Sequence, residues 1–163
     1  MMSPFVELVL RWLHVGSAVV LTGGLFFLAV IWLPAIRGQP GGATAAFEPL
    51  RSAWARTVGI CTLLLLGTGL VNGVTNILRY DFAQPGYHGL VAAKILVGLV
   101  VFLLAALLAG RTQLATRLRG RMPFWLSWAV ILALVLVLLG GYMRSISRVP
   151  KSTEVVPATS TDE

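Results

Sequence analysis

Four long apolar runs fill most of the chain and restrict it to structures that can be buried in lipid. They cover residues 5–36, 58–78, 90–110 and 124–142, and each is close to or longer than the roughly 20 residues that a membrane-spanning helix needs. Hydrophobic residues make up 57% of the chain and charged residues 12%, which is about half the charged share of a typical soluble domain. The sequence therefore predicts an all-α membrane protein, a bundle of four transmembrane helices.

The length of 163 residues leaves room for one compact bundle and no separate soluble domain. We expect a transmembrane domain over residues 1–149. Its helices are predicted at about 5–36, 56–78, 88–110 and 124–143. Residues 150–163, rich in Ser, Thr, Pro and acidic side chains, are predicted to form a disordered tail.

The connection between the first two spans contains an amphipathic segment. Phe47, Leu50, Trp54 and Val58 recur there at helical spacing. This pattern predicts an interfacial helix that leads into the second span.

The basic residues gather in the connections between the apolar runs. That distribution favours a role in membrane topology over nucleic-acid binding, so the lipid bilayer and not a nucleic acid is the expected partner. The connections after the first and third spans hold seven arginines: Arg37, Arg51, Arg56, Arg111, Arg117, Arg119 and Arg121. The side with both termini holds five cations: Arg11, Arg79, Arg144, Arg148 and Lys151. This bias predicts a multi-pass protein with both termini on the outer, periplasmic side.

Ionisable groups inside a membrane cost several kcal/mol unless they are paired or hydrated, so they are the first candidates for function. On the first span, Glu7, Arg11 and His14 lie at spacings that place them on one face. Glu7 can pair with Arg11, and either can orient the imidazole of His14. In the alternative interpretation, Glu7 and Arg11 are interfacial anchors and His14 is capped by a neighbouring helix.

Polar residues of the second and third spans fall at the same predicted outer level. Asn72 lies among small residues, Gly69 and Gly73, that are also typical of close helix packing. Lys94 is seven residues beyond Tyr87, hence on the same helical face and about 10 Å deeper. It either extends to the headgroups or faces the bundle, where it can bind an anion, hydrogen-bond a helix end or, when neutral, ligate a metal.

Three segments carry a family resemblance. They are TGLVN at residues 68–72, YHGLVAAK at residues 87–94 and an arginine, Arg111, where the third span ends. The Leu13-His14 pair and the later GGLF at residues 23–26 add to it. In these features the chain resembles the membrane domain of the copper-resistance protein D family. The resemblance implies a protein of the bacterial inner membrane that binds or transports copper. An enzyme is not expected, because the sequence has no hydrolytic triad, carboxylate pair, phosphate loop or zinc signature.

The resemblance also implies a metal site near the periplasmic end of the bundle. Imidazole suits copper and haem iron, and thioethers suit Cu(I). The residues expected to hold copper are His14, His88 and Met143. A periplasmic copper-binding protein is a candidate partner.

Other residues are expected to shape the pocket around that metal site. Lys94 and Asn72 would line it without ligating copper, because an ammonium group repels a cation. Tyr87 belongs to the same motif as Lys94, and Glu7 would set the tautomer of His14 through a hydrogen bond.

Two competing interpretations remain open at the level of sequence. Leu13-His14, with a histidine and a lysine at the start of the third span, resembles the membrane protoporphyrinogen-oxidase family more loosely. That likeness implies haem b held by His14 in an oxidoreductase. In the other interpretation, the chain is an accessory structural subunit that docks to a larger membrane complex through the small-residue face of the second span.

Overall fold

The computed structural model describes residues 3–36, 38, 42–82, 86–146 and 148–150. Four of its helices are long and apolar enough to cross a membrane. These spans are Pro4–Ala35, Ala45–Arg79, Gly89–Ala109 and Met122–Ser145. The prediction of an all-α membrane bundle with four spanning helices is therefore confirmed. The predicted disordered tail lies, from residue 151 onward, outside the described residues.

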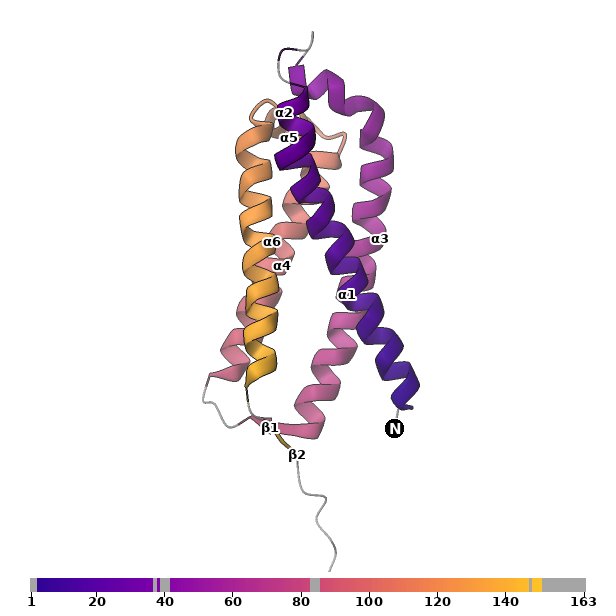
Figure 1. Cartoon of the computed structure of the whole chain (residues 1–163), viewed down its shortest axis with the longest axis vertical. Helices are drawn as coiled ribbons and strands as arrows, with labels where there is room; N and C mark the ends of the chain where they lie inside the picture. The colour runs from indigo at the N-terminus through magenta and orange to yellow at the C-terminus, as the bar shows by residue number, and fades with distance from the viewer. Residues whose placement is uncertain (1–2, 37, 39–41, 83–85, 147, 151–163) are drawn as a thin grey trace, which may run out of the picture.

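The four spans are arranged as a ring. α1 (Pro4–Phe26) packs on α3 (Gly42–Arg79), α3 on α4 (Tyr87–Ala109), α4 on α6 (Met122–Ser145), and α6 back on α1. α1 and α4 therefore occupy opposite corners. The start of α1, the connection from α3 to α4 and the end of α6 all lie at the lower end in Figure 1. This is the shared end that an even number of spans requires.

The first span changes its helical type near its upper end. α1 begins at Ser3, whose hydroxyl accepts a hydrogen bond from the backbone N–H of Val6. After Phe26 the span continues as a π-helix, η1 (Phe27–Trp32), and a short α2 (Leu33–Ala35). Pro34 has no N–H, and its ring crowds the carbonyl one turn earlier. The wider π-helical turn directly before Pro34 relieves that crowding.

The amphipathic segment of the first connection is continuous with the second span. α3 starts at Gly42 and includes Pro49 within its first turns, so the expected interfacial helix is the beginning of a single long helix. Its first turns cross the top of the bundle before the helix runs downward (Figure 1). Proline is a usual cause of such a bend.

Two small elements complete the fold. α5 (Gln113–Arg119) lies at the upper end between α4 and α6, and Thr112 caps it by accepting a hydrogen bond from Ala115 N–H. At the lower end, β1 (Tyr80–Phe82) pairs antiparallel with β2 (Arg148–Pro150). This ladder ties the connection after α3 to the end of α6.

The buried core lies in the upper half of the bundle. It contains Leu21 and Leu25 of α1, Val58 of α3, Val101 of α4 and Leu126 of α6, among others. Gly24 allows α1 to approach α3 closely, because a Cβ at this position would lie 2.5 Å from a ring carbon of Trp54. Real side chains do not approach so closely, so the indole occupies the space that glycine leaves free.

Replacing Gly24 with alanine is expected to destabilise the bundle by about 1–3 kcal/mol, the usual cost of overpacking. The measurement is the loss of helical circular dichroism of the detergent-solubilised protein as sodium dodecyl sulfate is added. Gly23→Ala is the matched control, since a Cβ there meets nothing within 4 Å. Equal midpoints for the two variants would contradict the role given to Gly24.

Candidate functional site

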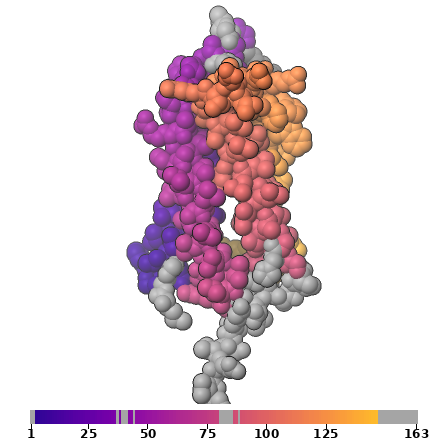
Figure 2. Space-filling model, turned by 180° about the vertical axis from the view of Figure 1, so that it is seen from behind, coloured from indigo at the N-terminus to yellow at the C-terminus, as the bar shows by residue number. Residues whose placement is uncertain are grey.

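The lower half of the bundle is more loosely packed than the upper half. We call residues 4–16 of α1, 69–79 of α3, 87–97 of α4 and 134–145 of α6 the open half. Among its described side chains, only Tyr87 and Met143 are buried. α1 and lower α3 diverge from α6 and α4 in Figure 1, and the space-filling view is hollowed between lower α3 and α4 (Figure 2). The open half therefore gives access to polar side chains inside the bundle.

His14 lies at the upper boundary of this open half, with its ring against α3. Its Nδ1 is 2.9 Å from the hydroxyl of Thr68. Its Cε1 is 3.2 Å from the point where a Cβ of residue 69 would lie, so Gly69 leaves room for the imidazole. The histidine is half-buried and is held by a neighbouring helix.

The hydrogen bond to Thr68 determines the tautomer of the ring. The single hydroxyl proton of Thr68 is donated to the carbonyl of Leu64. The hydroxyl oxygen can therefore only accept from His14, so Nδ1 carries the proton. In the neutral imidazole, Nε2 then keeps its lone pair and is available to a metal ion or a hydrogen-bond donor.

Lys94 brings a cation to the same site from the other helix pair. Its Nζ is 3.4 Å from the point where a Cβ of Gly140 would lie, so the amine rests against α6. Its positive charge lies within electrostatic range of the His14 ring. Of the predicted alternatives, the structure therefore favours a lysine that faces the bundle.

The carboxylates whose side chains are described lie elsewhere. Glu7 forms an ion pair with Arg79 at 2.7 Å, and Glu48 pairs with Arg51 at 2.8 Å. The structure thus differs from the expectation that Glu7 pairs with Arg11 and sets the tautomer of His14. Arg79, at the end of α3, is the partner of Glu7, and Thr68 is the partner of the ring.

The other predicted site residues are distributed over the open half. Asn72 is half-buried on α3, one turn below Thr68, and its backbone carbonyl accepts a hydrogen bond from the side chain of Asn76 at 2.7 Å. Tyr87 and Met143 pack together with Ile146 in a small apolar cluster between α4 and α6. His88 lies in the first turn of α4, and its side chain is outside the described residues.

The structure thus places His14 against Thr68 of α3 and Lys94 against Gly140 of α6, both on the inside of the bundle and from opposite corners of the ring. In the sequence, Thr68 stood out only as the first residue of the TGLVN segment, one turn before Asn72. Within the described part of the chain, no three His, Cys, Asp or Glu side chains gather into a metal site. A metal bound by His14 would need donors of other kinds, such as a thioether.

Comparison with known proteins yields no relative. No family model, no curated protein and no solved structure matches this chain. The function must therefore be argued from the geometry of the site.

Replacing Thr68 with valine is expected to release the imidazole of His14 at a cost of about 1 kcal/mol for the lost hydrogen bond. In ¹⁵N-histidine-labelled protein, the His14 ring should show protonated Nδ1 in the parent chain and a mixture of tautomers in the variant. Thr57→Val is the control, since Thr57 also donates to a carbonyl one turn earlier on α3. A ring protonated at Nε2 in the parent chain would contradict the assignment.

Proposed function

We propose that this chain is a copper-handling protein of the bacterial inner membrane, with His14 as the ligand that receives the metal. The observation that carries the proposal is the hydrogen bond between His14 Nδ1 and Thr68. This hydrogen bond fixes the orientation of the ring. It leaves the lone pair of Nε2 free in the half of the bundle that is not closely packed. A neutral imidazole held by a second residue is the usual form of a metal-ligating histidine.

The position of Met143 supports this proposal, and the position of Lys94 bears on how tightly the metal is bound. Met143 follows Gly140 by three residues on α6, hence lies on the same side of that helix, and its thioether suits Cu(I). The ammonium group of Lys94 repels a nearby metal cation and so weakens its binding. A site that binds a metal ion weakly suits its passage to a partner better than storage. His88, from the first turn of α4, completes the proposed set.

Orientation follows from the distribution of arginines in this proposal. The upper end of the bundle, with α5 and the first turns of α3, faces the cytoplasm, and the open half faces the periplasm. A periplasmic copper-binding protein would then deliver or accept the ion at the open half.

Metal analysis of the detergent-purified protein, loaded with Cu(I) under reducing conditions, is expected to find bound copper. His14→Ala should remove it, because no other group replaces the Nε2 lone pair. Thr68→Val should weaken binding by about 10–100-fold, the usual effect of losing the partner of a metal ligand. Thr57→Val should bind as the parent chain does. Undiminished copper in His14→Ala would reject the proposed site.

Haem is the second candidate, and the observation that favours it is the position of Lys94. An ammonium inside the bundle opposes the binding of a free cation but could pair with the carboxylates of a porphyrin. His14 would hold the iron, and the haem would supply redox chemistry. Protein that purifies with a Soret band, which shifts in His14→Ala and in Thr68→Val but not in Thr57→Val, would select haem over copper.

The orientation has its own test. In a Cys61→Ser background, a cysteine at Ser145 at the lower end is expected to react with a membrane-impermeant thiol reagent applied to intact cells. A cysteine at Gln113 on α5 should react only after the cells are opened. Both positions are exposed. The reverse pattern would place the open half in the cytoplasm and overturn the proposed orientation, whereas the copper experiment would be unaffected.

A further inference from the structure

A buried arginine at the upper end of the bundle has no partner in the described part of the chain. Arg119 is 7% exposed, and its Nε and Nη1 have no hydrogen-bond acceptor there. Arg51 is equally buried, but it is paired with Glu48. A guanidinium is always charged and carries only donors. Burial without an anion is therefore unfavourable for Arg119 and indicates that an acidic group is missing.

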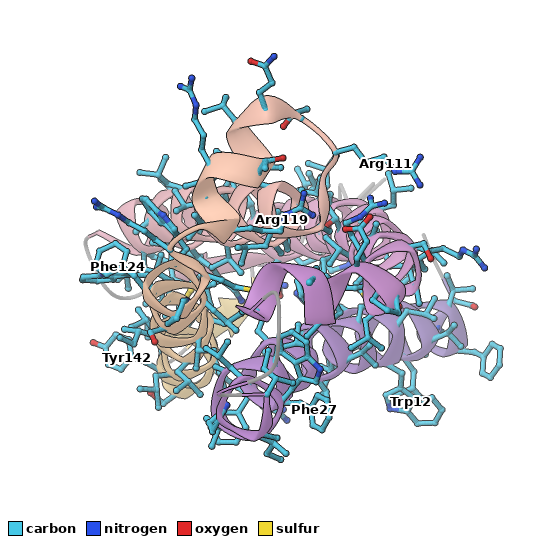
Figure 3. All side chains as sticks on the ribbon, turned by 90° about the horizontal axis from the view of Figure 1, so that it is seen from above. Trp12, Phe27, Arg111, Arg119, Phe124 and Tyr142 are labelled. Atoms are coloured by element: carbon cyan, nitrogen blue, oxygen red, sulfur yellow. The ribbon has the colours of Figure 1, made fainter. Side chains whose placement is uncertain are left out.

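Arg119 lies beside the end of α4. Ala115 and Arg119 are the buried residues of α5 and are one helical turn apart on the same face. A Cβ at Gly110 would lie 3.4 Å from the Cβ of Ala115, so this face of α5 covers Gly110, the residue that follows α4. Seen from above, Arg119 lies nearer the middle of the bundle than Arg111 (Figure 3).

An apolar groove ends beside Ala115, one helical turn from Arg119. It has a volume of about 480 Å³, runs between α3 and α4 and reaches Gly110 at its upper end. Its small residues leave space that a bulkier side chain would fill. Residues that line it from the two helices include Ala55, Gly59, Leu63, Leu103 and Ala106.

We propose that the groove and Arg119 together form a binding site for an anionic phospholipid. The phosphate pairs with the guanidinium of Arg119, whose planar fork matches two phosphate oxygens. One acyl chain lies in the groove between α3 and α4. Charge complementarity selects this occupant, since a neighbouring apolar helix would fill the groove but leave the arginine unpaired. Basic pockets between transmembrane helices bind anionic headgroups in this way.

Phospholipid binding is tested on the full chain after it has been delipidated in a non-ionic maltoside detergent. Native mass spectrometry follows the titration with phosphatidylglycerol or with phosphatidylcholine of the same chains. The parent protein is expected to prefer phosphatidylglycerol by about tenfold or more, the range of a charged hydrogen bond. Arg119→Gln should abolish the preference, and Arg117→Gln, an exposed arginine of the same helix, should keep it. Equal preference in Arg119→Gln and the parent would overturn the proposal.

The groove is tested separately from the headgroup. Gly59→Leu places a side chain where nothing lies within 4 Å, and Gly67→Leu does the same outside the groove on the same helix. Gly59→Leu should weaken binding of phosphatidylglycerol, and Gly67→Leu should not. Inorganic phosphate should neither bind nor compete at millimolar concentration. If phosphate displaces the lipid, or if Gly59→Leu binds normally, the site is not a phospholipid site.

Thermal unfolding gives a readout that a misfolded variant cannot mimic. Without lipid, Arg119→Met should melt at a higher temperature than the parent chain, because it removes an unpaired buried charge. Phosphatidylglycerol should raise the melting temperature of the parent and of Arg117→Gln but not of Arg119→Met. A variant that melts lower than the parent without lipid would show that Arg119 has a partner within the chain, and would overturn the proposal.

Discussion

Hydrocarbon offers no hydrogen-bond partner, and the structure depends on this constraint throughout. Every backbone N–H and C=O in the membrane must be paired within a helix, and a polar side chain must find a partner on its own helix or a neighbouring one. Thr68 does both, since it donates to Leu64 and accepts from His14. A threonine that would be unremarkable in water thereby fixes which nitrogen of a histidine is free. The same constraint makes the unpaired guanidinium of Arg119 significant.

Packing divides the bundle into two halves with different properties. In the upper half, Gly24 receives the indole of Trp54, and leucines of α1, α4 and α6 fill the core. In the open half, the inward positions hold His14, Asn72 and Lys94 in place of large apolar residues. Burying polar side chains in close packing is unfavourable, so the residues of the candidate site also explain why the open half is less closely packed. The close packing of the upper half holds α1, the helix that carries His14.

The sequence predicted the spans well because length and hydrophobicity alone define them. It also predicted that His14, Asn72 and Lys94 lie at a similar depth in the membrane, because depth follows from position along a spanning helix. It could not predict contacts between helices. Glu7 was expected to pair with Arg11 at a spacing of four residues, but Arg79 of the adjacent helix is its partner. α5 was missed because seven residues give little periodicity, although Thr112 provides a capping signal. Arg119 was counted only as a topology charge, and its burial depends on how α5 folds back on α4.

The pairing of β1 with β2 bears on the order in which the protein is assembled. β1 lies between the second and third spans, whereas β2 follows the last one. The ladder cannot form until the final helix has been inserted with its end on the same side as the earlier connection. During synthesis, therefore, the ion pair between Glu7 and Arg79 can join the first two spans early, but the base of the bundle closes last. A ribosome-bound chain that stops before residue 148 would lack that closure, even with all four spans in place.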